Sequence, residues 1–512
     1  MTGTIRAQDK AAKDTRFGVS AGHEHYKWWA LSCTSLGMLL AATNSGTLII
    51  ALPDLERSLH ASLLALVWVI LAYLIAATVL VLTAGRLSDL FGRKRAYIGG
   101  FVMFAFASLG AGFSGDATVL IIWRVLQGIG AAFIFANAAA LVTDAFPKEQ
   151  LGLAMGANTM VAAIGLVLGP VLGGALVAIS WHWVFWFNVP FALAGALWGA
   201  LILRELAKAD TVRGYDVPGT VTFVVGLTGL VLGVSKGGLS GWNDPLVIAG
   251  LAAGAVLLPL WIVIEKRSRA PMLDLTIFRN RLFAAASAAA FINGLARFAL
   301  MFLFVFYYQG AQGHSPITAG IMLIPLALGM LIASPLSGIY ADRHGSRALA
   351  AIGMFVSACG LAAMTTLQIH SPYWQSALWL AMVGVGSGMF NSPNTAAMMG
   401  AVPAKRRGVA AGARTLLQNT GAILSIAFVM AVVTSAVPKA TLFAVFSGLA
   451  SGLSADRLAP FIANMHVALW CLAGVSLLGT AVCLMRPSHV STDEQPQIAP
   501  HPAPTPVSAG SR

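Results

Sequence analysis

The side chains that could do chemistry in this sequence are few, and the most unusual are two arginines inside long apolar segments. Arg124 and Arg297 lie within runs that contain almost no other charge. A guanidinium is costly to bury in an apolar environment, so each should face a cavity or a polar partner. Two plainer interpretations remain open: Arg124 could extend to the membrane interface, and Arg297 could pair with a backbone carbonyl or a polar neighbour.

Other kinds of chemistry find little support. No Gly-Lys-Ser/Thr phosphate loop occurs, so ATP is not the expected energy source. The four cysteines lie inside apolar segments without metal-ligand spacing, which is typical of buried structural thiols: Cys33, Cys359, Cys471 and Cys483. We therefore expect no enzyme, no catalytic residue, no metal and no cofactor.

The elements that carry these side chains are membrane spans. Of the 512 residues, 58% are hydrophobic and only 10% are charged, whereas a soluble chain has about 25% charged residues. Spans of about 20 apolar residues can be placed near fourteen ranges: 28–52, 63–84, 96–114, 118–143, 151–179, 183–203, 217–235, 246–264, 282–308, 317–340, 348–369, 375–400, 408–436 and 463–485. The first is too long for a signal peptide and shows no cleavage site.

The basic residues predict how these spans are oriented. The net charge of +13 arises from cations in short loops rather than from a polar nucleic-acid-binding domain. If both termini are cytoplasmic, the cytoplasmic segments hold most of the 32 lysines and arginines, and the outer loops hold only Arg57, Lys236, Lys439 and Arg457. This positive-inside bias predicts a multi-pass protein of the cytoplasmic membrane with both termini inside. The acidic residues can all be placed in loops, tails or helix ends.

An internal repeat divides the chain. The basic turn Gly85–Arg95 has the frame Gly-x-x-x-Asp-x-x-Gly-x-Arg, which returns at Gly338–Arg347, 253 residues later. Both copies follow an outside-to-inside helix. The repeat predicts a cytoplasmic segment (1–27), two six-helix bundles (28–203 and 282–485), two peripheral helices between them (217–264) and a disordered tail (486–512).

Four motifs together resemble the Major Facilitator Superfamily, specifically its fourteen-span branch of drug:proton antiporters. They are the basic turn, Arg124-x-x-Gln127-Gly-x-Gly130, the run Gly165–Gly174, and Trp183-x-x-x-Phe187-Asn188-x-Pro190. The resemblance extends from about Thr47 to Leu484. It implies the all-α major facilitator fold, with two six-helix bundles and two additional helices, fourteen transmembrane helices in all.

The resemblance also implies roles for the basic turn. Gly85 and Gly92 allow a sharp turn and close helix packing. Asp89 would latch against the other half of the protein, at the helix that starts near Gly408, and Arg93 and Arg95 would brace that latch. The second copy offers Asp342 and Arg343 for the same purpose. Leu90 departs from the family, which usually has a cation there.

Two further motifs would belong to the transport pathway. Arg124 resembles the arginine that the family uses in proton transfer, and Gln127 completes its pattern. In the run Gly165–Gly174, small residues at every fourth position favour close packing and Pro170 bends the helix. By resemblance this run is the antiporter hinge and seal, formed by Gly165, Gly169, Pro170, Gly173 and Gly174.

One departure bears on coupling and substrate. Asn44 stands where the branch usually has an aspartate, so this position cannot titrate, although it can hydrogen-bond across helices. With Arg124 in the cavity, and Arg297 as a second candidate there, we expect a neutral or anionic amphipathic substrate; a cationic drug held by aromatic rings is the alternative. The candidates for a titrating group are Asp54, Glu56, Asp144 and His182. Asp54 is preferred because it shares the outer level with Arg124.

These features predict a secondary active transporter that exports amphipathic small molecules or drugs by proton antiport and alternating access. The expected partners are a small-molecule substrate, the proton and membrane lipids, without nucleic acid, and we expect a monomer. A proton-independent carrier of a lipid-like, anionic or neutral metabolite is the alternative. A non-transporting receptor is disfavoured by the intact latch and hinge.

Overall fold

The structure of the protein is a computed structural model. It describes residues 25–146, 151–205, 216–268, 271, 273, 275–402, 407–435, 437–438, 441–442, 445 and 455–486. Nearly all of the predicted N-terminal segment and of the predicted disordered tail lies outside the described residues.

Helices occupy all fourteen predicted ranges, which confirms an all-α membrane protein. The first half of the chain forms α2 (Tyr26–Leu59), α3 (Leu63–Phe91), α4 (Arg93–Gly112), α5 (Ala117–Ala145), α6 (Leu151–Ile179), α7 (Trp183–Trp186) and α8 (Asn188–Ile202). Next come α9 (Val217–Ser240) and α10 (Pro245–Arg267). The second half forms α11 (Arg281–Val305), the π-helical η3 (Phe306–Ala311), α12 (Pro316–Met322), α13 (Ile324–His344), α14 (Ser346–Met364), α15 (Tyr373–Gly400), α16 (Arg407–Ser435) and α18 (Ala455–Leu484).

Within the described ranges, twelve helices are long and apolar enough to cross a membrane. The two further predicted spans, α6 and α15, are helices of 29 and 28 residues. In α6 the described apolar stretch is Leu168–Ile179. In α15 the buried face carries Ser387, Asn391 and Asn394.

Three predicted helix boundaries were wrong by about two helical turns. The second helix was expected to end at Ala84, but α3 continues through Gly85 to Phe91, so that the turn lies at Gly92 alone. The other two boundaries lie next to a proline. The first helix was expected to end at Leu52, before Pro53, but α2 continues to Leu59. The last helix was expected to start at residue 463, but α18 starts at Ala455 and contains Pro460. Prolines are tolerated in membrane helices because neighbouring groups satisfy the freed backbone atoms.

Aspartates begin several helices and so stay out of the bundle interior. The Asp116 side chain accepts hydrogen bonds from the backbone N–H of Thr118 (2.8 Å) and Val119 (3.0 Å) at the start of α5. Asp244 caps α10 in the same way. Lys236 donates a hydrogen bond to Asp244, which lowers the pKa of this carboxyl. These caps satisfy backbone donors that would otherwise lack a partner.

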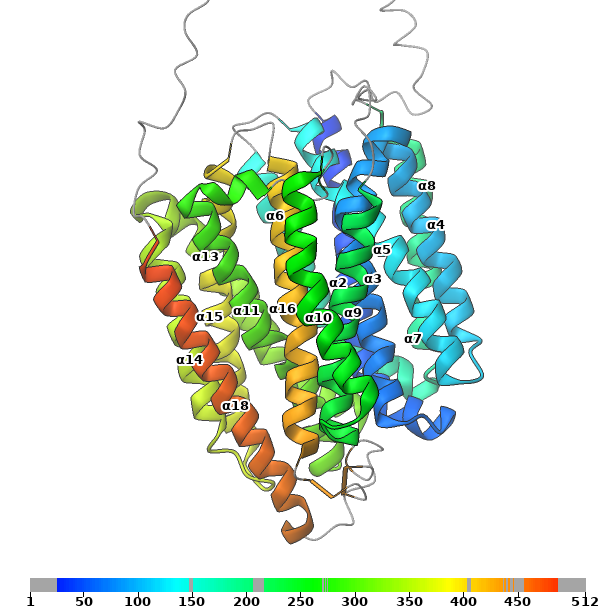
Figure 1. Cartoon of the computed structure of the whole chain (residues 1–512), viewed down its shortest axis with the longest axis vertical. Helices are drawn as coiled ribbons and strands as arrows, with labels where there is room; N and C mark the ends of the chain where they lie inside the picture. The colour runs from blue at the N-terminus through cyan, green and yellow to red at the C-terminus, as the bar shows by residue number, and fades with distance from the viewer. Residues whose placement is uncertain are drawn as a thin grey trace, which may run out of the picture.

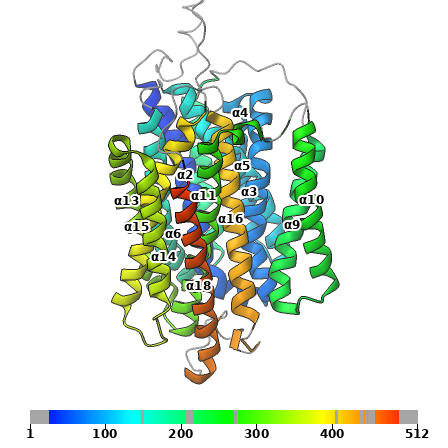
Figure 2. The same ribbon diagram turned by 60° about the vertical axis from the view of Figure 1, so that its left-hand side comes forward.

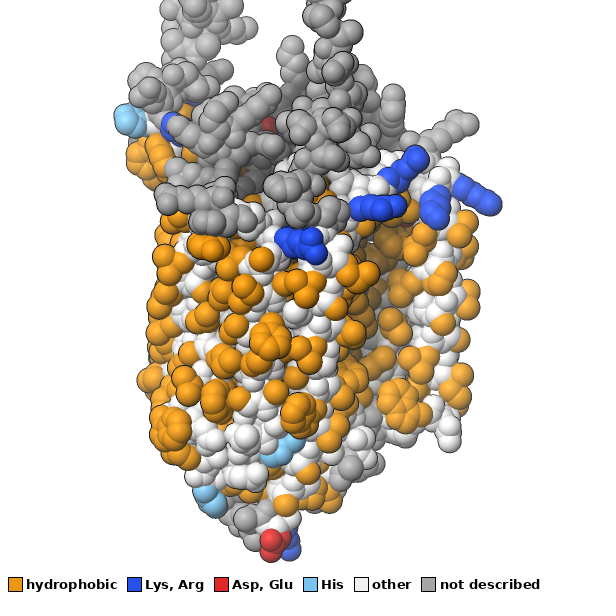
Figure 3. All heavy atoms as spheres, turned by 90° about the vertical axis from the view of Figure 1, so that its left-hand side faces the viewer, with side chains coloured by type: hydrophobic (Ala, Val, Ile, Leu, Met, Phe, Trp, Pro, Cys, Tyr) orange, Lys and Arg blue, Asp and Glu red, His pale blue; other side chains and the backbone are white. Residues whose placement is uncertain are grey.

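The helices stand side by side as one bundle (Figure 1). The start of α2 and the end of α18 lie at the same end of it, at the top of Figure 1, which we name the terminal end; the other end is the opposite end. Figure 3 shows apolar side chains around the middle of one face, with Lys and Arg gathered at the terminal end. Such a belt of apolar side chains matches a bilayer.

The two halves of the chain each pack mainly within themselves. In the first half α2 packs on α6, and α5 packs on α3 and α4. In the second half α11 packs on α16, α13 on α15, and α14 on α15 and α18. Between the halves, α6 contacts α12 and α3 contacts α16.

The hairpin of α9 and α10 lies at the edge of the bundle (Figure 2). Its helix α9 packs against α10 on one side and against both α3 and α16 on the other. The hairpin therefore covers the line along which the two halves meet at α3 and α16.

Candidate functional site

Arg124 is completely enclosed in the first half, with 1% of its surface exposed. Its Nε donates a hydrogen bond to the Val69 carbonyl oxygen (2.9 Å), and its Nη1 donates to Gln127 Oε1. The guanidinium also lies 4.3 Å from the centre of the Tyr73 ring. Neutral groups thus satisfy this buried cation, and no carboxylate of the described residues pairs with it.

Gln127 extends this contact into a network that, with Val69 and Tyr73 of α3, joins five helices. Its Nε2 donates to Asn44 Oδ1 on α2 (3.3 Å) and to Ser108 Oγ on α4 (2.7 Å). Asn188 Nδ2 at the start of α8 also donates to Asn44 Oδ1 (3.2 Å). The structure therefore brings together the sequence-predicted Asn44, Arg124 and Gln127.

Three members of this network were not predicted as site residues: Tyr73, Ser108 and Asn188. Asn188 belongs to the motif Trp183–Pro190, which we had interpreted only as a mark of the antiporter branch. An asparagine at the start of an apolar helix was the available signal. The side chains of Tyr73 and Ser108 could not be assigned without knowing which helices face one another.

The predicted titratable groups lie apart from this network. Asp54, which we prefer from the sequence as the titrating group, has its Oδ1 2.5 Å from Arg57 Nη2 on its own helix. Asp144 pairs with Arg93. The His182 ring stacks on Trp181 with 3.8 Å between centroids. Partial burial lowers the pKa of His182 below its ordinary 6.5, which leaves the ring mostly neutral at pH 7.

Glu56 is the exception among the predicted acids. It has 2% of its surface exposed, and its Oε2 makes no hydrogen bond within the described part of the chain. No ion pair to Glu56 is formed there either. This carboxyl can therefore gain or lose a proton without breaking an ion pair.

Arg297 lies in α11 and makes no contact with the first-half network. Its Nη1 lies 3.6 Å from the Met330 sulfur, and its guanidinium carbon lies 5.0 Å from the centre of the Phe298 ring. Its Nε is buried without a hydrogen-bond partner in the described part of the chain. Unlike Arg124, this cation is poorly satisfied.

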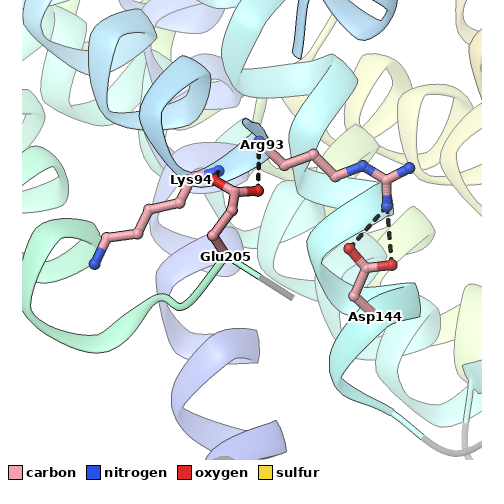
Figure 4. Close-up of polar contacts among 4 residues, drawn as sticks. All are labelled: Arg93, Lys94, Asp144 and Glu205. Carbon is pink, nitrogen blue, oxygen red and sulfur yellow. Dashed lines mark hydrogen bonds and ion pairs between the residues drawn. The ribbon is translucent and has the colours of Figure 1, made fainter. Parts of the chain in front are cut away.

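The basic turn is held within the first half (Figure 4). Arg93 Nη1 binds both oxygens of Asp144 at the end of α5, at 2.9 and 2.7 Å. Glu205, after α8, accepts hydrogen bonds from the backbone N–H of Arg93 (2.8 Å) and Lys94 (3.2 Å). The carboxylate thus caps the first turn of α4, where the helix dipole favours negative charge.

The glycines of the two repeat copies adopt matching conformations. Gly92 has φ = +97° and Gly345, 253 residues later, has φ = +87°. Both lie in the left-handed region that favours glycine. An added Cβ at Gly85 would still be 3.9 Å from its nearest neighbour, Ala136. A tight turn therefore requires the second glycine of each copy, and Gly85 has room to spare.

The predicted latch falls largely on side chains that the structure does not describe. The side chains of Asp89, Asp342 and Arg343 are among them. Arg95 is exposed, and Arg93 braces α5 of its own half. One turn before the basic turn, Leu82 of α3 contacts Gly412 of α16: a Cβ added at Gly412 would lie 2.7 Å from Leu82 Cδ2.

The run Gly165–Gly174 gives α6 two close contact surfaces. Cβ atoms added at Gly165, Gly169 and Gly173 would lie 2.8 to 2.9 Å from Ala42, Gly46 and Thr47 of α2. A Cβ added at Gly174 would lie 2.6 Å from the Ile317 Cα in α12, and the Pro170 carbonyl contacts Gly320. One side of α6 therefore packs on its own half and the other on the second half.

A further contact joins the halves near the opposite end. Gln309 Nε2, in η3, donates a hydrogen bond to the Ile50 carbonyl oxygen in α2 at 3.3 Å. Together with Gly174–Ile317 and Pro170–Gly320, it closes the two halves against each other at that end.

A family model described as the Major Facilitator Superfamily matches residues 34–426 and, in a second match, 286–509. A tetracenomycin C resistance and export protein from Streptomyces glaucescens is 31% identical over 401 residues, which are 78% of this chain and 74% of that protein. The multidrug resistance protein Stp from Mycobacterium tuberculosis is 34% identical over 403 residues, with the same shares of the two chains. Among solved structures, a bacterial homologue of the human lysosomal transporter Spinster is similar in fold, with a TM-score of 0.62 at 15% identity, covering 91% of this chain and 98% of that one.

Replacing Gln127 should show how much the buried network stabilises the protein. Gln127→Leu keeps the volume but removes the acceptor for Arg124 and the donor to Asn44 and Ser108. We expect the free energy of unfolding to fall by about 2–4 kcal/mol, because each buried group left unsatisfied costs about 1–3 kcal/mol. The measurement is the thermal denaturation of purified protein in detergent. Gln418→Leu is the matched control, because the partly exposed Gln418 makes no side-chain hydrogen bond to the described residues; equal shifts in the two variants would contradict the network's importance.

Gly92→Ala tests the turn between α3 and α4. The added methyl must adopt φ = +97° and would lie 2.5 Å from Glu205 Oε2. We expect the free energy of unfolding to fall by about 1–3 kcal/mol in the same denaturation measurement. Gly99→Ala, in α4 with nothing within 4 Å of its Cβ position, should be neutral or slightly stabilising. The turn would not require glycine if both variants denatured like the unmodified protein.

Proposed function

Because the chain belongs to the Major Facilitator Superfamily, we propose that it exports amphipathic small molecules or drugs from the cytoplasm by alternating access coupled to proton entry. The observation that carries this proposal is the two-sided packing of α6, which lies closely on α2 of its own half and on α12 of the other. A helix with both contacts can separate from one surface while it stays on the other.

The chain is a multi-pass membrane transporter of small molecules and not an enzyme. The relatives' names support the proposed export of drugs, because they refer to resistance to and export of tetracenomycin C and to multidrug resistance. Drugs of this kind combine apolar rings with a few polar groups, so an amphipathic substrate fits an apolar bundle that contains a few polar side chains.

The proposal divides the bundle into two moving bodies, α2–α8 and α11–α18, with α9 and α10 as additional helices at their edge. Its orientation follows from charge. Lys and Arg gather at the terminal end, so this end would face the cytoplasm and the opposite end the outside. The contacts Gly174–Ile317 and Gln309–Ile50 would then close the outer side.

Coupling requires a group that titrates, and Glu56 is our choice in place of Asp54. Asp54 and Asp144 are each held in an ion pair. Glu56 is buried near the outer end of α2 and unpaired. Movement at the outer contacts could therefore change its access to water, whereas Asn44 keeps the first-helix position uncharged throughout.

The test is transport by purified protein in liposomes with and without a pH gradient, using a lipophilic cation and a matched anionic amphiphile. We expect gradient-driven export by the unmodified protein and by Asp54→Asn. Glu56→Gln should lose the response to the gradient and keep exchange at equal pH, because the transport cycle remains but no proton is carried. Undiminished gradient-driven export by Glu56→Gln would rule out this assignment.

A proton-independent carrier of a lipid-like, anionic or neutral metabolite is the second candidate. It is favoured by the first-half network, in which Asn44 and Arg124 meet no carboxylate. Transport by the unmodified protein at the same rate with and without the pH gradient would favour this candidate. It would contradict the proton coupling in the export proposal.

Gly174→Ala tests the seal. Its methyl would lie 2.6 Å from the Ile317 Cα, so closure at the opposite end should become less favourable by about 1–3 kcal/mol. In a variant that lacks the four native cysteines, Ile50→Cys should then be labelled about tenfold faster from the opposite end of the bundle.

Gly474→Ala, with open space at its Cβ position, is the control and should leave the labelling rate unchanged. A Gly174→Ala rate equal to that of this control would mean that α6 and α12 do not form the seal.

A further inference from the structure

Arg297 occupies the position in the second half that Asn44 occupies in the first. It follows Asn44 by 253 residues, the spacing that also separates Gly92 from Gly345, whose backbones match. Both residues lie in the first helix of their half, α2 and α11. The repeat therefore places an amide on one side of the bundle and a cation at the equivalent place on the other.

The two buried arginines, Arg124 near Asn44 and Arg297, differ in how well they are satisfied. The Asn44 oxygen accepts two hydrogen bonds, and the nearby Arg124 has Val69, Gln127 and Tyr73 as partners. Among the described residues, Arg297 has the Met330 sulfur, a weak acceptor, and the Phe298 ring as its partners. A guanidinium has five N–H donors, and leaving most of them unused in an apolar bundle is costly. The second half therefore lacks an acceptor that the first half provides for itself.

The Ser387 hydroxyl on α15 also lacks a partner among the described residues, and the register of α11 and α15 places it near Arg297. Asn394 Nδ2 on α15 donates to the Ala286 carbonyl oxygen on α11 (3.0 Å), which fixes the register of these antiparallel helices. Two turns along each helix from this pair come Asn293 and Ser387, which therefore face each other. The Asn293 amide is already directed at α14, where its Nδ2 donates to the Met354 sulfur (3.5 Å), and its Oδ1 is an acceptor. Ser387 Oγ is buried and makes no hydrogen bond within the described residues, so it is the hydroxyl donor that is left without a partner. Arg297 follows Asn293 by one turn on the same face.

This cluster is turned towards the interior of the bundle. The peripheral α18 packs on another side of α11, where Gly479 contacts Ile292. On a third side α16 packs at Gly294. The contact of Arg297 with Phe298 directs the guanidinium to the side between α15 and α16. Arg297 is partly exposed there, and α2 of the first half contacts α11.

We propose that Arg297, with the Ser387 hydroxyl, binds the acidic group of an amphipathic organic anion, which is the class of compound that the protein exports. The inference rests on the proposed export function and specifies its substrate. A carboxylate or sulfonate supplies the acceptors that the guanidinium and the hydroxyl lack. The apolar part of the anion lies against Phe298 and Met330. A lipophilic cation is disfavoured because Arg297 repels it and already covers the Phe298 ring.

The test is equilibrium binding to the purified full-length protein in detergent, followed by dansyl fluorescence. Three probes share one fluorophore: dansylglycine is an anion, dansylglycinamide is neutral, and dansylcadaverine is a cation. We expect the unmodified protein to bind dansylglycine about tenfold or more tightly than dansylglycinamide, as a charge-assisted pair predicts. Arg297→Gln should abolish this preference and leave dansylglycinamide binding within about twofold.

Three further variants separate recognition from structure. Arg297→Lys should keep part of the preference, because the charge remains without the planar fork. Ser387→Ala should weaken dansylglycine binding alone by several-fold, since one neutral donor is lost. Arg457→Gln, an exposed cation at the start of α18, should behave like the unmodified protein.

The proposal is overturned if Arg297→Gln weakens the anion and the neutral probe equally, or if the unmodified protein prefers dansylcadaverine. If Arg297→Gln does not fold, Arg297→Lys and Ser387→Ala decide the matter by the same comparison. Transport by the same protein in liposomes distinguishes the two proposals. Export of dansylcadaverine without Arg297-dependent anion binding would retain the exporter and reject the anion site. Arg297-dependent anion binding without any export would retain the anion site and reject the exporter.

Discussion

Every polar side chain buried in this bundle must find its partner within the protein, because neither lipid tails nor the apolar interior offers one. In the first half, neutral groups meet that requirement for the Arg124 guanidinium, and the result is a network that ties α2, α3, α4, α5 and α8 together. Around Arg297 the same requirement is unmet. The contrast between a satisfied and an unsatisfied arginine is the main asymmetry of the molecule.

Close backbone packing is the second constraint on the fold. Glycines of α6 lie against α2 and α12, where even one methyl group would collide with backbone atoms. Dispersion forces act over such short distances, so these contacts hold firmly when closed and are lost within a small separation. Helices joined in this way behave as rigid pairs, and relative movement of the halves is confined to the surfaces between them.

The sequence was sufficient to locate the helices, because uninterrupted apolar runs have few other structural solutions in a membrane. Their ends were less certain: Pro53 and Pro460 are inside helices whose neighbours tolerate them. Family motifs identified Arg124, Gln127 and Asn44 as site residues. The ion pair of Asp54 with Arg57, one turn away on the same helix, was not predicted. The facing of Asn293 and Ser387 depends on the register between α11 and α15, which no local pattern encodes.

The position of α9 has a consequence for the route by which cargo can leave. This helix lies across α3 and α16, where the two halves meet, and α10 covers it from outside. A lateral exit from the interior into the bilayer along this seam is therefore obstructed by two helices. The equivalent seam at α6 and α12–α13 has no such hairpin between the described helices. Lateral access between the interior and the lipid is thus unequal on the two flanks. Among the described helices, a hairpin covers the seam at α3 and α16 and none covers the seam at α6 and α12–α13.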